Sequence, residues 1–176
     1  MIKVDFCLPR SIRIKLNTSC QLRCKFCHQE GFLNSKDINP EELIKALIIF
    51  KKECGFYRVH FTGGEPTLYT EFRELLAKTK KLGFLNAVTT NGQFKSDELV
   101  SLRRAGLDSI NFSLHTINPY DFLVIQDVHL GIRKRLKWAK LCIENTIKNI
   151  LLAKKIIKNT KVNCVVSDNL TGPKEA

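Results

Sequence analysis

Three cysteines, Cys20, Cys24 and Cys27, lie within one short polar stretch and place the strongest constraint on what this chain can fold into. Three residues separate the first pair and two separate the second, so one loop can direct all three thiols at one centre. A structural zinc site takes four protein ligands. A four-iron cube held by three cysteines leaves one iron free to bind another molecule. From this stretch alone, a zinc site completed by His28 or by a distant residue is an alternative to an iron–sulfur cluster.

The other four cysteines do not suggest a disulfide framework. The total of seven is odd, and the clustering favours metal binding with some buried thiols in a reducing compartment. Cys54, Cys142 and Cys164 have apolar neighbours, so we expect them to pack in the core. The sequence assigns no role to Cys7. The start of the chain lacks the pattern of a signal peptide, and no apolar run could span a membrane, so we expect a cytoplasmic protein without a membrane partner.

The chain is strongly basic, with 29 Lys and Arg against 17 Asp and Glu and a formal net charge of +12. Such a balance suits an anionic partner: a nucleotide phosphate, RNA or an acidic electron-donor protein. Much of the excess lies in residues 133–140, which a solvated helix face explains. Proteins that read nucleic acids usually interleave aromatic residues with the basic ones, so a nucleic-acid partner is not expected.

Strand and helix patterns alternate along the chain. The expected strands are residues 12–16, 57–62, 84–90, 107–114 and 161–166, and the expected helices are residues 40–54, 70–81, 96–105 and 133–158, with a shorter helix before the last. This alternation implies right-handed βαβ units and a parallel sheet.

The length of 176 residues is short for a complete eight-stranded barrel. We therefore expect an α/β fold, a partial (βα) parallel barrel of about five strands with an open lumen. Its domain would cover residues 11–167, after a lead-in over residues 1–10. Residues 168–176 read as a polar tail, and the chain is expected to be incomplete at its C-terminus.

Two faces can be distinguished on the expected strands. Val59 and Phe61 alternate with His60, and Val162 and Cys164 occupy equivalent apolar positions on the last strand. The strands of a filled barrel would be apolar on both faces. We therefore expect the apolar face to meet the helices and the polar face to line a cavity.

Each unusual loop follows a strand. The cysteines follow the first strand, Gly63-Gly64-Glu65-Pro66 follows the second, Thr89-Thr90-Asn91-Gly92 closes the third, and Ser113 ends the fourth. The carboxyl ends of parallel strands meet at one edge of a sheet, where the sites of α/β proteins lie. These motifs are therefore expected to form one site.

The pair of motifs Cys20-x-x-x-Cys24-x-Phe26-Cys27 and Gly63-Gly64-Glu65-Pro66 resembles the radical S-adenosylmethionine (SAM) superfamily, over about residues 12–166. The resemblance implies that a 4Fe-4S cluster is held by Cys20, Cys24 and Cys27, and that SAM is bound by Phe26, Gly63, Gly64, Glu65 and Ser113. It further implies an electron donor of the flavodoxin or ferredoxin type. One electron then cleaves SAM to a deoxyadenosyl radical, which abstracts hydrogen from a substrate in the lumen.

Within that superfamily the chain is most similar to the GTP 3',8-cyclases of molybdenum cofactor biosynthesis. The similarity is carried by Cys27-His28-Gln29-Glu30-Gly31, by Thr89-Thr90-Asn91-Gly92 and by Asn111-Phe112-Ser113-Leu114. It implies that a purine nucleotide, GTP in that family, is read by Arg13, His60, Thr89, Thr90 and Lys161. The family usually has an arginine where this chain has His60. Its second cluster and final Gly-Gly have no counterpart after Val166.

Two other interpretations stay open from the sequence. One is a radical SAM protein that modifies a peptide or natural product, since such proteins share the core and differ in their tails. The other is a non-catalytic metal- or RNA-binding scaffold. A missing sixth strand would leave an exposed sheet edge, which a second copy could cover, so a homodimer is also a hypothesis.

Overall fold

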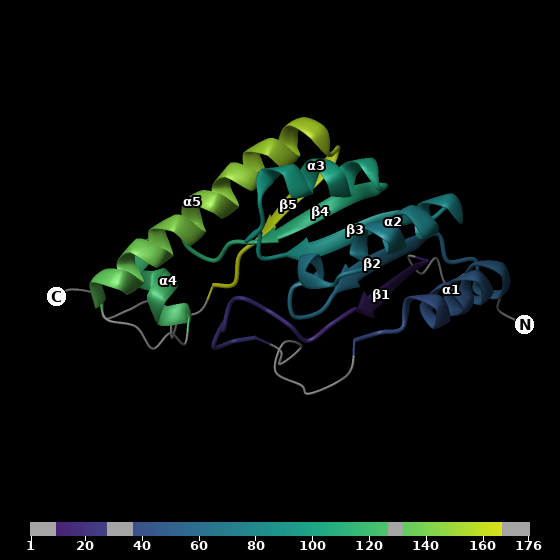
Figure 1. Ribbon diagram of the computed structural model, residues 1–176, viewed down its shortest axis with the longest axis horizontal. Coiled ribbons are helices and arrows are strands. Elements are labelled where there is room, and N and C mark those ends of the chain that lie inside the picture. Colours follow the sequence, from purple (N-terminus) through teal and green to yellow (C-terminus); the bar gives the residue numbers. More distant parts are fainter. Residues whose placement is uncertain (1–9, 28–36, 127–131, 167–176) are drawn as a thin grey trace, which may run out of the picture.

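The computed structural model describes residues 10–27, 37–126 and 132–166. These residues form one sheet of five parallel strands, arranged in sequence order (Figure 1). The strands are β1 (Ser11–Lys15), β2 (Arg58–Thr62), β3 (Leu85–Thr90), β4 (Leu107–Ser113) and β5 (Asn159–Asn163). The helices are α1 (Pro40–Cys54), the short 3-10 helix η1 (Pro66–Leu68), α2 (Phe72–Lys81), α3 (Ser96–Arg104), α4 (Pro119–Ile125) and α5 (Ile132–Ile156).

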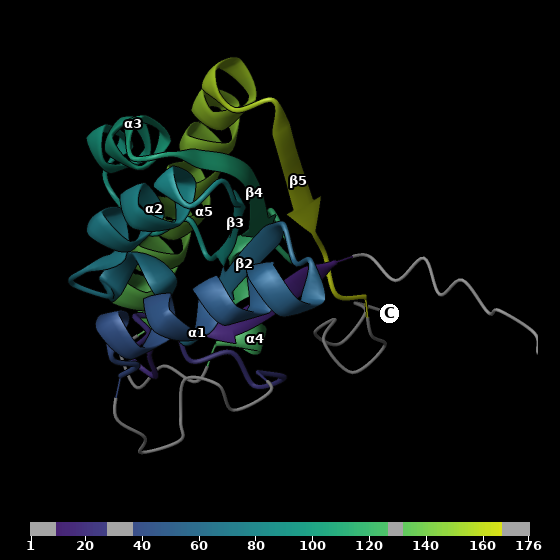
Figure 2. The same cartoon turned by 90° about the vertical axis from the view of Figure 1, so that its right-hand side faces the viewer.

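The sequential strand order decides where the helices lie. Each strand pairs with the next one in the chain, and every pairing is parallel. Right-handed crossovers that always advance in one direction place their helices on one face of the sheet. Figures 1 and 2 show α1, α2, α3 and α5 along that face. The expected five-stranded parallel α/β architecture is confirmed, and the opposite face of the sheet carries no helix within the described residues.

Local signals set the ends of α1 as expected. The side-chain oxygen of Asn39 accepts hydrogen bonds from the backbone N–H groups of Glu41 and Glu42, at 2.9 and 3.1 Å. This satisfies two of the amide groups that a helix start leaves without partners. At the other end Gly55 has a φ of 68°, a left-handed conformation that a glycine adopts without strain.

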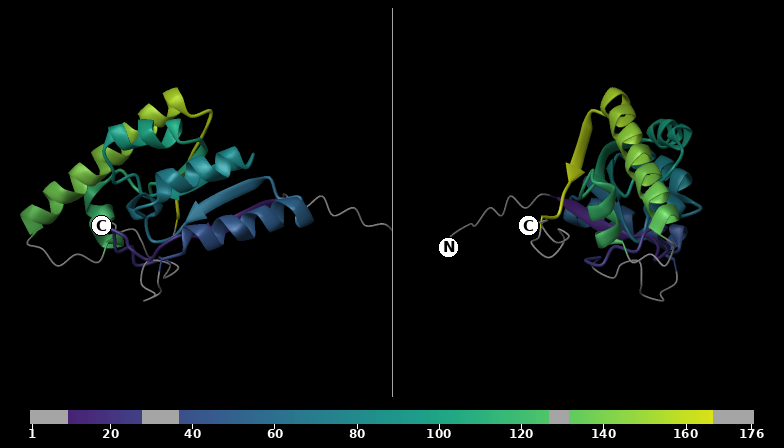
Figure 3. Two further views of the ribbon diagram at one scale, coloured as in Figure 1. Left: turned by 45° about the vertical axis from the view of Figure 1, so that its right-hand side comes forward. Right: turned by 90° about the vertical axis from the view of Figure 1, so that its left-hand side faces the viewer.

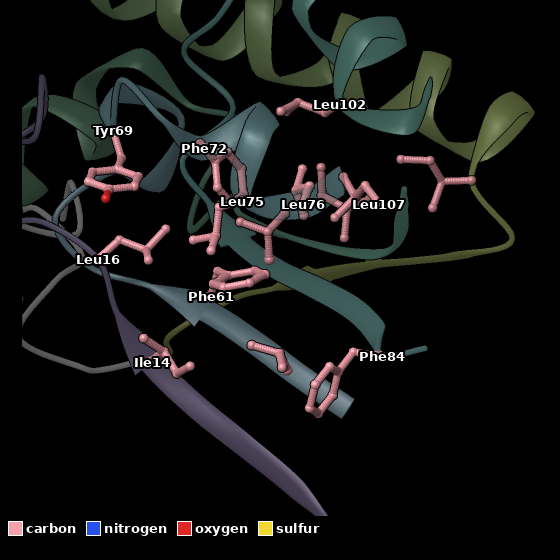
Figure 4. Packing of buried hydrophobic residues seen from close by; sticks show 14 of the residues in the cluster. Ile14, Leu16, Phe61, Tyr69, Phe72, Leu75, Leu76, Phe84, Leu102 and Leu107 are labelled. Atoms are coloured by element: carbon pink, nitrogen blue, oxygen red, sulfur yellow. The ribbon is translucent and has the colours of Figure 1, made fainter. Parts of the chain in front are cut away.

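The main core lies between the sheet and these helices. Val59 and Phe61 of β2 are fully buried, which confirms the expected apolar face of this strand. Figure 4 shows Phe61 beneath Leu75 and Leu76 of α2. The Phe61 ring also meets the ring of Phe72 edge to face, with centroids 5.6 Å apart. Such aromatic pairs contribute about 0.5–1.5 kcal/mol beyond the area that they bury.

A second, smaller hydrophobic cluster joins α4 to α5. Its buried members are Phe122, Ala139, Cys142 and Ile143, and Leu22 from the stretch between β1 and α1 packs against them. We call it the α4–α5 cluster. Figure 3 shows α4 beside one end of α5. The cluster buries Cys142 as expected, to 7% exposure.

Two expectations about the last strand and the remaining cysteines were wrong. β5 begins two residues before the expected position and ends at Asn163, and Val162 on it is 48% exposed. Cys164, the residue after β5, is exposed as well. Within the described residues β5 is an edge strand, paired with β4 alone. Cys54 is the last residue of α1 and is also exposed.

Several expectations fall on residues outside those described. They concern Cys7, His28, the motif residues 29–31 and the tail over residues 168–176. Among the described helices, none combines the length and the apolar composition needed to cross a bilayer.

Candidate functional site

The motifs at the carboxyl ends of the strands surround one pocket of about 320 Å³. The predicted site residues that line it are Arg13, Cys20, Cys24, Phe26, Cys27, Gly63, Gly64, Thr89, Thr90 and Ser113. The remaining predicted residues, His60, Glu65 and Lys161, are not part of its lining. A wider groove of about 600 Å³ lies on the surface of α5 and holds none of the predicted residues.

The stretch of residues 17–27, which we call the cysteine loop, lies directly against the Gly63–Gly64 turn. The backbone N–H of Gly64 donates to the carbonyl of Asn17 at 3.0 Å, and the N–H of Glu65 donates to the carbonyl of Ser19 at 2.7 Å. A Cβ atom on Gly64 would lie 2.6 Å from the carbonyl oxygen of Thr18, closer than real contacts allow. Glycine at this position therefore permits the two loops to meet.

Glu65 ties the Gly63–Gly64 turn to the end of β3. Its carboxylate accepts hydrogen bonds from the Thr67 N–H and hydroxyl at 3.1 and 2.7 Å, from the Thr90 hydroxyl at 2.8 Å and from the Asn91 N–H at 2.7 Å. The side chain is fully buried. Burial raises the pKa of Glu65, and these hydrogen bonds oppose that effect. The carboxylate thus accepts hydrogen bonds from four donors within the protein, whereas the family resemblance implies that it binds SAM.

Polar side chains of α5 hold the turn that follows β3. Asn145 and Asn149 each donate from their amide nitrogens to the carbonyls of Gly92 and Phe94, at 2.8–3.2 Å. Thr146 donates to the Asn91 carbonyl at 3.0 Å. Sequence reasoning assigned these residues no role. Their signal in the sequence is a set of amide and hydroxyl side chains within one turn of an otherwise apolar helix face.

The three cysteine thiols line the same pocket. Burial raises the pKa of Cys20 to about 11, and burial also raises the pKa of Cys24. Metal binding must therefore displace protons from both thiols. Each of the two sulfurs accepts a hydrogen bond from an amide side chain: Asn91 Nδ2 lies 3.6 Å from Cys20 Sγ, and Gln126 Nε2 lies 3.0 Å from Cys24 Sγ.

The three thiols share one cavity without meeting at a single point, which does not exclude a cube. Among the described residues, no three His, Cys, Asp or Glu side chains come close enough together to hold a single metal ion. Three cysteines on a four-iron cube each bind a different iron, so their sulfurs surround the cluster and need not meet at one point. Cys20, Cys24 and Cys27 all face one cavity beside a glycine turn, as such ligands would.

Aromatic side chains close another part of the pocket wall. The ring of Phe26 meets the ring of His115 edge to face, with centroids 4.7 Å apart. His115 Nδ1 accepts a hydrogen bond from the Val165 N–H at 3.1 Å. Burial lowers the pKa of His115. Sequence reasoning gave this histidine no site role, although it is part of the lining.

The predicted nucleotide-reading residues are only partly brought together. His60 Nε2 lies 2.7 Å from Thr89 Oγ1, and His60 lies opposite Arg13 in the pairing of β2 with β1. Lys161 is exposed on β5, opposite Asn111 of β4. The structure therefore places Arg13, Thr89 and Thr90 in the pocket lining, and His60 and Lys161 are outside that lining.

We expect His60 to titrate below its ordinary pKa of 6.5, because burial, then Arg13, then Arg58 disfavour its charged form. Arg13→Gln should raise the pKa of His60 by removing one of these cations, whereas Arg104→Gln on the exposed face of α3 should not. NMR titration of the imidazole signals measures both. When the pKa of a histidine is lower in the folded state than in the unfolded state, the free energy of unfolding decreases as the pH falls through the unfolded-state pKa. Unfolding experiments should therefore show stability decreasing below about pH 6.5. An unchanged His60 pKa in Arg13→Gln would contradict this electrostatic coupling.

Comparison with known protein families gives one match over most of the chain. The model described as "Radical SAM superfamily" matches residues 14–173.

The chain is similar in sequence to part of several curated proteins. The chain is 34% identical over 164 residues to the GTP 3',8-cyclase of Aquifex aeolicus, covering 88% of this chain and 47% of that protein. It is 32% identical over 158 residues to the probable GTP 3',8-cyclase of Sulfolobus acidocaldarius, covering 89% and 47%. A probable GTP 3',8-cyclase of Thermococcus kodakarensis is 38% identical over 111 residues, covering 62% and 36%. The chain therefore spans less than half the length of these relatives.

Solved structures share the fold at low sequence identity. The structure of anSMEcpe with bound AdoMet superposes with a TM-score of 0.65 at 22% identity, over 90% of this chain and 44% of that one. Streptococcus suis SuiB, bound to its precursor peptide SuiA, gives a TM-score of 0.61 at 21% identity, over 88% and 39%. These likenesses confirm the expected fold class, a partial parallel barrel.

Proposed function

Because this chain belongs to the radical SAM superfamily, we propose that it is a radical SAM enzyme whose substrate is a purine nucleotide, as for a GTP 3',8-cyclase. The observation that carries the proposal is that three cysteine thiols and the Gly63–Gly64 turn line one pocket at the carboxyl edge of the sheet. The family match over residues 14–173 and the similarity to GTP 3',8-cyclases support it.

In this proposal Cys20, Cys24 and Cys27 hold a 4Fe-4S cluster and leave one iron for SAM. When bound, the cluster supplies the electron that cleaves SAM to methionine and a deoxyadenosyl radical, which takes hydrogen from the substrate. The protein keeps the thiols in a partly buried wall, so water has limited access to them. Buried surroundings strengthen electrostatic interactions at the site.

SAM would lie along the rest of the same wall. Gly63 and Gly64 let backbone approach closely, which suits the methionine end, and Phe26 offers an aromatic face to the adenine. Ser113 lines the same pocket and can donate or accept a hydrogen bond. Glu65 acts in this proposal by fixing the turn that carries the glycines, since its carboxylate has four internal donors.

The nucleotide would take the part of the pocket beside β1 and β3. Arg13 offers a fixed cation for a phosphate, and Thr89 and Thr90 are part of the same pocket lining. His60 orients Thr89 through the contact at 2.7 Å. Lys161 would act from β5 as an exposed cation near the open edge.

Further parts of the proposal concern the whole protein. Residues 11–167 would act as one unit in a reducing, cytoplasmic compartment, where the thiols stay reduced. Electrons would come from an acidic flavodoxin- or ferredoxin-type donor, which the net charge of +12 attracts. The exposed edge of β5 would allow pairing with a second copy.

The test is anaerobic. The protein is reconstituted with iron and sulfide, mixed with SAM and dithionite, and assayed for deoxyadenosine with GTP, with ATP and without nucleotide. We expect deoxyadenosine to rise with GTP and much less with ATP. Production that is indifferent to GTP would remove the nucleotide from the proposal and leave the radical chemistry. No deoxyadenosine from protein with a full cluster would overturn the enzyme assignment.

A further inference from the structure

Gln126, the residue after α4, has its side chain buried against the cysteine loop. It is 3% exposed. Its amide nitrogen donates to Cys24 Sγ at 3.0 Å, and its amide oxygen accepts a hydrogen bond from the Arg23 N–H at 2.9 Å. The nitrogen and the oxygen of this buried amide therefore form hydrogen bonds with two consecutive residues of the cysteine loop.

Backbone contacts fix this amide in place. Cys24 and Gln126 form an isolated antiparallel bridge, and the Lys25 N–H donates to the Ile125 carbonyl at 2.9 Å. The Gln126 N–H itself closes α4 by bonding to the Phe122 carbonyl at 3.0 Å. Since the α4–α5 cluster buries Phe122 and Ile125 is also buried, the end of α4 is a rigid support for the Gln126 side chain.

We propose that Gln126 is a positioning residue for the cluster, and that its hydrogen bond to Cys24 raises the reduction potential of the cluster. This inference rests on the proposed function, because it requires a cluster on Cys24. The inference gives a role to Gln126 at the end of α4, which belongs to neither the cysteine motif nor the glycine motif.

The physical reason lies in the charge of the sulfur. Adding an electron to the cluster increases the negative charge on its thiolate ligands. An N–H group aimed at a thiolate stabilises the more negative, reduced state more than the oxidised one, and hydrogen bonds to sulfur are among the factors that set such potentials. In a buried site this effect is stronger than in water.

A second amide provides an internal comparison. Asn91 Nδ2 lies 3.6 Å from Cys20 Sγ, a longer contact than that of Gln126 with Cys24, and the same nitrogen also donates to the Gln21 side-chain oxygen at 3.1 Å. Because this donor is shared and more distant, its influence on the potential should be smaller.

The experiment measures the midpoint potential of the reconstituted protein by dithionite titration followed by EPR, in wild type, Gln126→Met and Gln93→Met. Methionine keeps the length of the side chain and removes the donor. Gln93 is a matched control, since its amide lines the same small cavity as Gln126 and donates to the Cys142 carbonyl and the Thr146 hydroxyl instead. We expect Gln126→Met to shift the reduction equilibrium against the reduced cluster by about tenfold, which is 59 mV for one electron. Gln93→Met should not change it.

The outcomes separate this inference from the function on which it rests. Wild-type protein that binds no iron and gives no EPR signal would overturn the proposed function itself. A full cluster with the wild-type potential in Gln126→Met would overturn the role of Gln126 and leave the function standing. If Gln126→Met does not retain a cluster, Gln126→Asn decides, because it keeps the amide but withdraws the donor by one methylene. A lowered potential in that variant supports the inference, and an unchanged potential contradicts it.

Discussion

Cys24→Ala is expected to leave a folded protein that no longer retains an iron–sulfur cluster and no longer produces deoxyadenosine. Cys24 lies in the wall of the pocket, and its sulfur accepts the hydrogen bond from Gln126 at 3.0 Å. Loss of a group that merely supports a metal ligand already lowers metal affinity by about 10–100-fold. Loss of the ligand itself should reduce both cluster content and activity by more than about 100-fold.

Iron and sulfide content, visible absorbance and the deoxyadenosine assay measure this result. Cys54→Ala is the matched control, because Cys54 is an exposed thiol at the end of α1, outside the pocket lining. It should retain the cluster and the activity. A Cys24→Ala protein with a full cluster and wild-type activity would show that the three cysteines do not act together, and the proposed site would have to be abandoned.

Glu65→Ala is expected to destabilise the fold strongly, even though Glu65 is not part of the pocket wall. The substitution leaves the Thr90 hydroxyl and the N–H groups of Thr67 and Asn91 without their acceptor. A fully buried donor left without a partner destabilises a protein by about 1–3 kcal/mol. The Thr90 hydrogen bond is buried and the Thr67 and Asn91 bonds are half-buried, so we expect the free energy of unfolding in urea to fall by about 2 kcal/mol or more.

Glu71→Ala serves as the control for the loss of a carboxylate. Glu71 precedes α2, is exposed and makes no side-chain capping bond. It should change the free energy of unfolding by less than about 0.5 kcal/mol. A Glu65→Ala protein of unchanged stability but weakened SAM binding would favour direct contact between Glu65 and SAM over the internal role seen in the structure.

Much of the fold can be predicted from local patterns. Apolar residues at period two identified the strands, and Asn39 and Gly55 marked the ends of α1 because their side chain and backbone conformation act locally. The position of the pocket was also predictable, since parallel strands bring their carboxyl ends to one edge. The edge strand was harder, because alternation shows which residues share a face but not whether a helix covers it. Val162 has the pattern of a core residue and is 48% exposed.

The supporting contacts of the site were not predictable for a related reason. The Glu65 carboxylate accepts hydrogen bonds from Thr90 and Asn91, which are distant in the sequence and come close to it only when β2 and β3 pair. Gln126 meets Cys24 across an isolated bridge between segments about one hundred residues apart. No local pattern in the sequence links Gln126 to the cysteine loop, so sequence reasoning assigned it no role.

The separation of the α4–α5 cluster from the main core has a consequence for local unfolding of the protein. Residues that share a hydrophobic cluster tend to unfold together, and amide hydrogen exchange detects such cooperative units. Leu22 packs with the α4–α5 cluster, whereas the sheet packs within the main core. Loosening of α4 should therefore release the part of the cysteine loop from Leu22 to Lys25, which contacts the end of α4, while the strands remain protected. The segment that carries Cys24 would then exchange with α4 rather than with the sheet, and access to the proposed cluster site would be governed by the smaller unit.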